Sequence, residues 1–171
     1  MLLTIIGALL AAAPATGANP IAPALAGQVE CQRPNEQAKT CRSMATYRPL
    51  GGARYSNSAL ILLSPQGPVT LRVTSDVEVK HGAVCGLLRR EDLDKGTLMV
   101  GDHVLGAKEA APGLGQVAQA MASLLGKEIC TTYESTASGL VGRLAVDGVA
   151  RPEFDVPVKL VGPGDGYKVA P

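Results

Sequence analysis

Residues 69–80 constrain the fold more strongly than any other segment, because aliphatic and polar side chains alternate along their whole length. The aliphatic residues of one parity are Val69, Leu71, Val73, Val77 and Val79. Successive residues of a strand point to opposite faces, so this period of two predicts an antiparallel strand with one buried face. Ser75 interrupts the apolar face, which is consistent with a β-bulge.

Two short turn sequences predict β-hairpins. Gly101-Asp102 lies between two apolar runs, and Asp147-Gly148 directly follows the apolar run 144–146. Glycine next to aspartate favours the tight turns that join paired strands. Three shorter apolar or alternating runs predict further strands over 59–63, 129–133 and 156–161.

Pro157 favours an edge position for the last of these strands, because proline cannot donate a hydrogen bond to a neighbouring strand. Residues 27–58 contain several prolines, glycines and polar runs, so we interpret them as a loop-rich N-terminal segment. Their composition gives no long hydrophobic period.

One segment, at about residues 113–126, has the period of an amphipathic helix. Its apolar residues recur at helical spacing: Leu114, Val117, Ala118, Met121, Leu124 and Leu125. Gly126 would end the helix. Together with the strands, this pattern predicts an α+β fold, an antiparallel β-sheet of hairpins packed against one main amphipathic helix and stapled by disulfides.

The first 26 residues contain no Lys, Arg, Asp or Glu and predict an export signal. Their apolar stretch, residues 2–13, is shorter than the roughly 20 residues that a transmembrane helix needs. We expect cleavage after Ala26, which leaves residues 27–171 as a single exported domain. The small residues around Ala26 are not followed directly by a cysteine, so we expect no lipid anchor and a periplasmic or secreted protein.

An exported chain folds where thiols oxidise, so its four cysteines, Cys31, Cys41, Cys85 and Cys130, predict two disulfides. Four cysteines allow three pairings. We prefer Cys31 with Cys41 and Cys85 with Cys130, because cysteines close in sequence meet first. The spacings lack the short knuckle of a zinc site, so we expect no metal.

Two further patterns carry little chemistry. Residues 113–118 match a dinucleotide-binding fingerprint, but no buried strand ends directly before them, so we expect no cofactor. His81 and Cys85 are close enough in sequence to suggest a base and a nucleophile, but a disulfide at Cys85 would remove the thiol.

The formal net charge of +1 and the aromatic content of 3% argue against binding to nucleic acid, which needs a basic surface and stacking platforms. The most one-sided basic stretch suggests a weak candidate binding surface made of Arg42, Tyr47, Arg48 and Arg54. A protein or a component of the cell envelope would be a suitable partner for it.

These observations favour an exported, non-enzymatic binding or envelope-associated domain whose ligand the sequence does not name. The alternative is a small secreted hydrolase whose site combines residues distant in sequence, with His81 or His103 beside a carboxylate and a nucleophile. A third reading is a secreted inhibitor that presents the disulfide-tied segment from Cys31 to Cys41.

Overall fold

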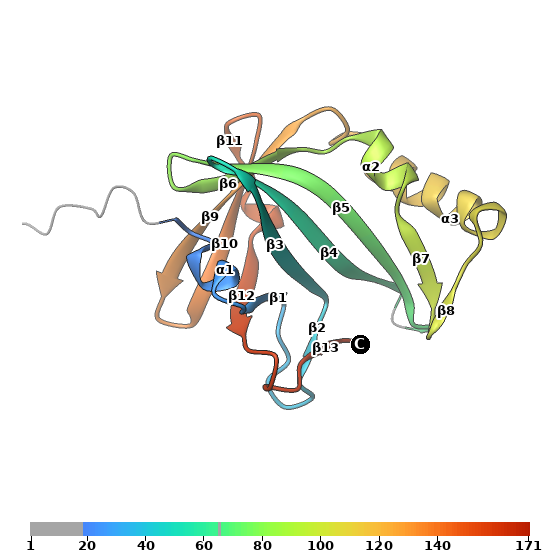
Figure 1. Cartoon of the computed structure of the whole chain (residues 1–171), viewed down its shortest axis with the longest axis horizontal. Coiled ribbons are helices and arrows are strands. Elements are labelled where there is room, and N and C mark those ends of the chain that lie inside the picture. Colours follow the sequence, from blue (N-terminus) through green and yellow to red (C-terminus); the bar gives the residue numbers. More distant parts are fainter. Residues whose placement is uncertain (1–18, 65) are drawn as a thin grey trace, which may run out of the picture.

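The computed structural model describes residues 19–64 and 66–171. Eight antiparallel strands form a closed β-barrel in which each strand pairs with its neighbours in chain order (Figure 1). The strands are β1 (Val29–Gln32), β3 (Ser43–Gly51), β4 (Arg54–Ser64), β5 (Val69–Lys80), β6 (Ala83–Leu87), β9 (Glu128–Thr136), β10 (Gly139–Val146) and β12 (Val156–Val161). Pairing of β12 with β1 closes the barrel.

The predicted α+β fold, a sheet packed against one main helix over 113–126, is therefore wrong. The longest helix, α3 (Ala107–Ala120), starts earlier than expected and ends before the turns of residues 121–126. It does not cover the barrel, because it packs on the short strand β7 (Thr97–Val100) and on the N-terminal half of β5. Part of the apolar period over 113–126 belongs to the turns after α3 and not to a helix.

Strand β5 pairs with β4 along one edge and with two different strands along the other edge. Its C-terminal end pairs with β6, whereas its N-terminal end pairs with β7, which pairs in turn with β8 (His103–Val104). Leu71, Leu98, Ala110 and Leu114 form a separate hydrophobic cluster under α3. Helix α2 (Arg90–Asp94) contacts α3, and Figure 1 shows both on the side of the molecule opposite α1 (Ala22–Leu25).

The strand register divides the barrel residues into an inner and an outer set. Val77 lies opposite Tyr55 on β4, and both side chains face the interior. Because paired residues lie on the same face of the sheet, the register of each strand pair identifies the inward residues of the next strand. Residues 69–80 form β5 as predicted, with their aliphatic parity inward. Ser75 also points inward and causes no bulge there, since the register of β5 with β4 shifts only between Leu62 and Ser64.

The expectation of a loop-rich segment at 27–58 is wrong, because this segment contains β1, β3 and part of β4. Its inward positions include polar side chains, among them Glu30, Gln32 and Ser43. A polar inner face removes the hydrophobic alternation by which a strand is recognised. The prolines and glycines mark the ends of strands here, not a continuous loop.

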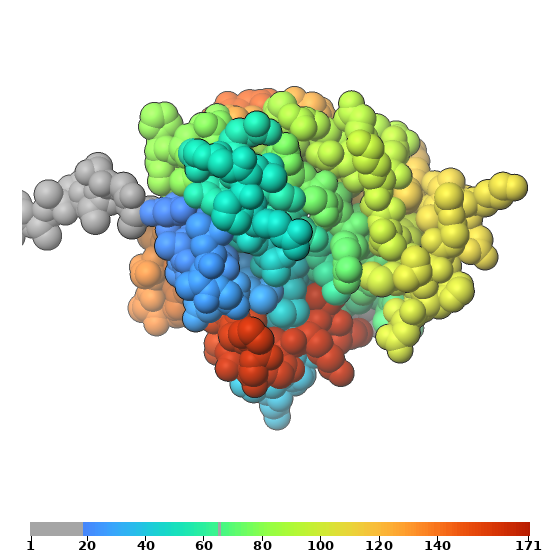
Figure 2. Space-filling view, in the orientation of Figure 1, coloured from blue at the N-terminus to red at the C-terminus, as the bar shows by residue number. Residues whose placement is uncertain are grey.

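Helix α1 closes one end of the barrel. Ile21 is 2% exposed, and with Ala24 it packs against Tyr55 and Val84. The Asn19 side-chain amide donates a hydrogen bond to the Tyr55 hydroxyl at 3.0 Å. In the space-filling view of Figure 2, the blue atoms of this segment lie against the cyan atoms of the β3–β4 hairpin.

These contacts bear on the predicted export signal. Cleavage after Ala26 would remove a segment, residues 19–26, that packs into the folded structure. The apolar stretch 2–13 lies outside the described residues. The boundary after Ala26 therefore remains a prediction.

The hairpin predictions are confirmed. Gly101-Asp102 joins β7 to β8, and Asp147-Gly148 joins β10 to β11 (Val149–Ala150) with positive φ angles at both turn residues. The edge position predicted from Pro157 is wrong, because β12 lies between β10 and β1. Pro157 is the second residue of β12 and precedes Val158, where pairing with β1 begins; its carbonyl accepts a hydrogen bond from the Arg33 amide.

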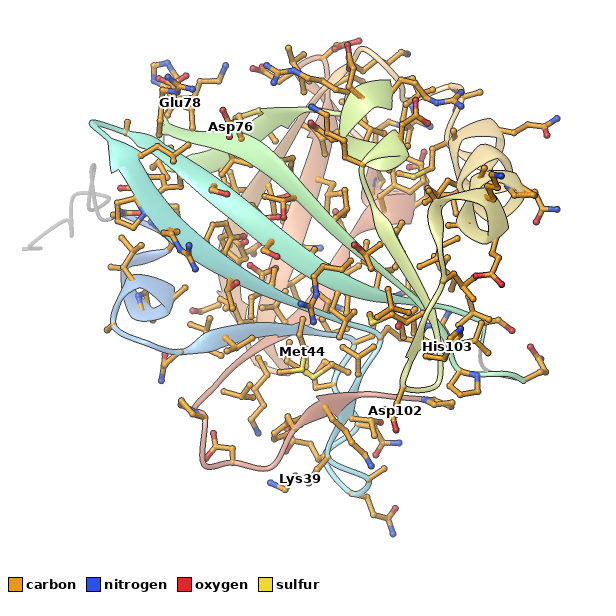
Figure 3. The ribbon with its side chains drawn as sticks, turned by 45° about the vertical axis from the view of Figure 1, so that its right-hand side comes forward. Lys39, Met44, Asp76, Glu78, Asp102 and His103 are labelled. Carbon is orange, nitrogen blue, oxygen red and sulfur yellow. A yellow bond between two sulfur atoms is a disulfide. The ribbon has the colours of Figure 1, made fainter. Side chains whose placement is uncertain are left out.

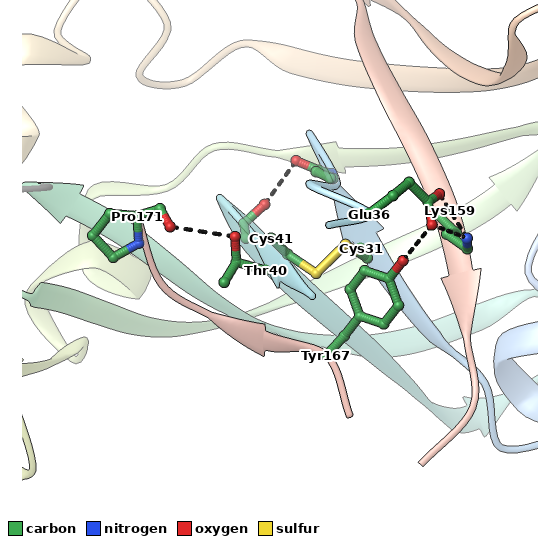
Figure 4. Close-up of a disulfide and its surroundings, with 9 residues drawn as sticks. Cys31, Glu36, Thr40, Cys41, Lys159, Tyr167 and Pro171 are labelled. Carbon is green, nitrogen blue, oxygen red and sulfur yellow. Dashed lines mark hydrogen bonds and ion pairs between the residues drawn. A yellow bond between two sulfur atoms is a disulfide. The ribbon is translucent and has the colours of Figure 1, made fainter. Parts of the chain in front are cut away.

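A second, two-stranded sheet lies beside the barrel. Strand β2 (Thr40–Cys41) pairs in parallel with β13 (Lys168–Val169) near the C-terminus. Glu36, in the loop before β2, accepts hydrogen bonds from the Lys159 ammonium at 2.6 Å and from the Tyr167 hydroxyl at 2.7 Å (Figure 4). Both bonds hold this loop against the outer wall of the barrel.

Candidate functional site

The interior of the barrel is not filled by side chains. An eight-stranded barrel is just wide enough to be filled by its own side chains or to hold one small ligand. Several inward positions here carry very small residues: Ala45, Ala59, Ser75, Gly86 and Gly142. Because these residues leave space between the walls, two adjoining cavities remain inside, and both contact Val77.

The first cavity lies at the open end of the barrel and has a volume of about 400 Å³. Aliphatic and aromatic side chains make most of its wall: Val77, Leu88, Met121, Leu124, Ile129, Leu144, Val146 and Phe154. Met121 and Leu124 come from the turn after α3, and Phe154 from the short 3₁₀ helix η1 (Pro152–Phe154). This volume falls within the range of small-molecule sites, about 300–1,000 Å³.

The second cavity lies deeper, toward α1, and has a volume of about 230 Å³. Seven of its twelve lining residues are polar, so we call it the polar cavity, and one of them is Glu30, which is 2% exposed. The hydroxyl of Tyr133 donates to Glu30 Oε2 at 2.7 Å, and the hydroxyl of Tyr47 donates to the same oxygen at 2.9 Å. The amide of Gln32 donates to Glu30 Oε1 at 2.8 Å.

These hydrogen bonds explain how a carboxylate is tolerated inside the barrel. Burial of a charged group is costly unless donors compensate for the lost water, and here three donors do so. Burial, reinforced by the charge of Glu30, raises the pKa of Tyr47 and of Tyr133 far above the usual range of a phenol. Both phenols therefore remain neutral donors at physiological pH.

The barrel's two ends differ in accessibility. The α1 segment packs over the end next to the polar cavity, whereas the apolar cavity opens between β6, β10 and the segments that connect the strands. Arg33 and Glu153 stand at this mouth. Glu153 forms an ion pair with Arg151 at 2.6 Å. A molecule that entered here would pass apolar walls before it reached Glu30.

The structure does not bring the four residues of the predicted basic surface together. Arg42, Arg48 and Arg54 are exposed on the outside of the molecule, and Arg54 pairs with Asp76 at 3.1 Å. Tyr47 has the opposite parity and points into the barrel. Of the four, only Tyr47 lines one of the two cavities inside the barrel, so the sequence singled it out for a different reason.

The cysteines form the two preferred disulfides. Cys31 joins Cys41 (Figure 4), and Cys85 joins Cys130 across the β6–β9 pair. Cys85, Glu128 and Cys130 are the one group of potential metal ligands close enough together in the described part of the chain. Because both sulfurs are in a disulfide and Glu128 pairs with Lys80, this group is not a metal site.

Neither histidine named for the hydrolase alternative lines either cavity. His81 lies in the exposed turn between β5 and β6, and the Cys85 thiol is oxidised. Figure 3 shows His103 beside Asp102 at the tip of the β7–β8 hairpin, where both side chains are exposed. The fingerprint at 113–118 lies within α3 instead of at its start, so its backbone amides cannot bind a phosphate.

Sequence reasoning missed Glu30, Gln32 and Tyr133. A signal was present around β1, where Val29 and Cys31 alternate with two polar residues. Once Cys31 is assigned to an external disulfide, Glu30 and Gln32 must point to the other face. That face is the interior, so the polar residues form the wall of a cavity.

None of the helices in the described ranges is long and apolar enough to cross a membrane. Intramolecular disulfides are typical of proteins that fold outside the cytoplasm, and this chain has two. Comparison with models of protein families, with curated proteins and with solved structures returned no match for this chain.

Proposed function

We propose that this protein is an exported, non-enzymatic binding protein, periplasmic or secreted, that holds a small and largely apolar molecule inside its barrel. The observation that carries the proposal is the apolar cavity of about 400 Å³ at the open end. Burial of apolar ligand surface is favourable by roughly 25 cal/mol per Å². A ligand with a short aliphatic chain would therefore gain affinity from these walls without any charged contact.

Non-enzymatic binding is favoured over hydrolysis by the chemistry of the walls. The apolar cavity is lined mainly by aliphatic groups, and the polar cavity contains a carboxylate held by neutral donors. Catalysis by a hydrolase needs a nucleophile next to a base. The two disulfides support export, because they are stable in an oxidising compartment.

The experiment is a titration of the purified protein with 1-octanol, followed by isothermal calorimetry and by NMR. Ser75→Phe places a ring at the inner wall of the apolar cavity and should weaken binding at least tenfold. Thr74→Phe is the matched control, because Thr74 directly precedes Ser75 on β5 and is exposed on the outer face. Equal binding by both variants, or no binding by the unchanged protein, would contradict the proposal.

A further inference from the structure

The buried Glu30 has no cationic partner. The ion pairs among the described residues all lie at the surface, and none includes Glu30. The inward positions of the eight barrel strands carry no Lys, Arg or His. The charge of this carboxylate therefore faces the polar cavity and is compensated by hydrogen bonds alone.

The polar cavity mainly offers hydrogen-bond acceptors to a ligand. A carboxylate has about four lone-pair sites, and three donors occupy three of those on Glu30. The phenol hydrogens of Tyr47 and Tyr133 already bond to Glu30, so their oxygens can only accept. Gln32 uses one of its two amide hydrogens for Glu30 and accepts from Ser43 with its oxygen at 2.9 Å.

A ligand group that fits this cavity must donate hydrogen bonds and carry a positive charge. An alkylammonium group satisfies both conditions, because it has three donors and no acceptor. A neutral alcohol can donate one hydrogen bond, and a carboxylate would meet both the charge of Glu30 and a set of occupied donors.

We propose that the barrel binds a small primary amine with an apolar tail, with the ammonium group at Glu30 and the tail in the apolar cavity. This inference rests on the proposed function, because it assigns the polarity of a molecule held in the same barrel. Both cavities contact Val77, so a single molecule that spans them would lie against this side chain. The ammonium group occupies the closed end, and the tail points toward the mouth.

The test compares three probes of equal chain length, 1-octylamine, 1-octanol and octanoate, each below its aggregation concentration and at one pH near neutrality. We expect octylamine to bind about tenfold to hundredfold more tightly than octanol, as is typical for a hydrogen bond to a charged group. Glu30→Gln keeps the shape of the side chain and removes its charge. In that variant octylamine should lose this advantage, and octanol affinity should change less than threefold.

Glu134→Gln is the matched control, because Glu134 is adjacent to Tyr133 on β9 but is exposed and pairs with Arg143. It should leave the preference for octylamine unchanged. If Glu30→Gln does not fold, the ranking of the three probes on the unchanged protein still decides the matter. Tyr133→Phe, which removes one hydroxyl next to the carboxylate, then gives a second reading of the same site.

The outcomes separate the two proposals. Equal affinities for octylamine and octanol overturn the amine assignment and leave the apolar binding function standing. Tightest binding of octanoate also overturns it, and places the ligand's head group at Arg33 in the mouth. Failure of all three probes to bind contradicts both proposals.

Discussion

Truncation of Ile21 to alanine tests whether the segment before Gly27 belongs to the folded domain. The side chain is 2% exposed and packs against Tyr55 and Val84. The change removes three carbon atoms, which at about 0.8 kcal/mol per buried CH₂ lowers the free energy of unfolding by about 2.4 kcal/mol. The cavity left behind adds to this loss, so we expect a total of about 3 kcal/mol, within the usual range for such changes.

The assay is urea unfolding of the chain that begins at Asn19, followed by far-ultraviolet circular dichroism. With a denaturant slope of about 2 kcal/mol per M, the midpoint should fall by about 1.5 M. Leu25→Ala is the control, because Leu25 lies in the same helix and is 38% exposed. It should lower the free energy of unfolding by less than about 1 kcal/mol.

Small and equal shifts for the two variants would refute the reasoning. Helix α1 would then not contribute to the core, and cleavage after Ala26 would leave an intact domain. A large shift for Ile21→Ala alone predicts instead that the exported chain retains Ile21. Intact mass of the mature protein would show this directly, since its N-terminus would lie before Ile21.

Two further predictions concern packing and pH. Gly115→Ala should stabilise by up to about 1 kcal/mol, because a Cβ there meets nothing within 4 Å. Gly113→Ala should destabilise, because its Cβ would lie 2.8 Å from a leucine methyl group of β7; equal gains in thermal unfolding would contradict this packing. Hydrogen bonds from Lys159 and then Tyr167 hold the pKa of Glu36 below its ordinary 4.5. The loop contact should therefore be complete above about pH 4.5 and be lost as pH falls through the lowered pKa. The chemical shifts of the Tyr167 ring protons should change with pH in this range as the contact is lost. Shifts that stay constant would refute the prediction.

The sequence predicts local structure well wherever a strand or turn shows its own pattern. Strand β5 was predicted from alternation, and the hairpins from glycine and aspartate. The barrel could not be predicted in the same way, because its closure depends on pairing between Val29 and Val161, at opposite ends of the described chain. The hydrophobic periodicity of a single segment contains no information on pairing with a strand so far away in the sequence.

The candidate site was missed for a related reason. In the sequence, the basic residues and the histidines are the most conspicuous candidates for a site. The polar cavity is instead lined by Glu30, Tyr47 and Tyr133, which come from three strands. Each of these residues looks ordinary in its own segment. Only the register of the closed barrel places them around one cavity. A single sequence therefore shows the residue types but not that these residues lie close together in the fold.

The closure of the barrel by its first and last strands also has a consequence for how the chain folds. Strand β1 is synthesised first, but its pairing partner β12 is complete only at Val161. Until then one edge of β1 is open, and an open strand edge can pair with another chain. The nearby Cys31–Cys41 bond spans only 10 positions in sequence, so it can form while this edge of β1 is still unpaired. Oxidation of that pair can therefore hold the amino-terminal end in shape before β12 is available to pair with β1.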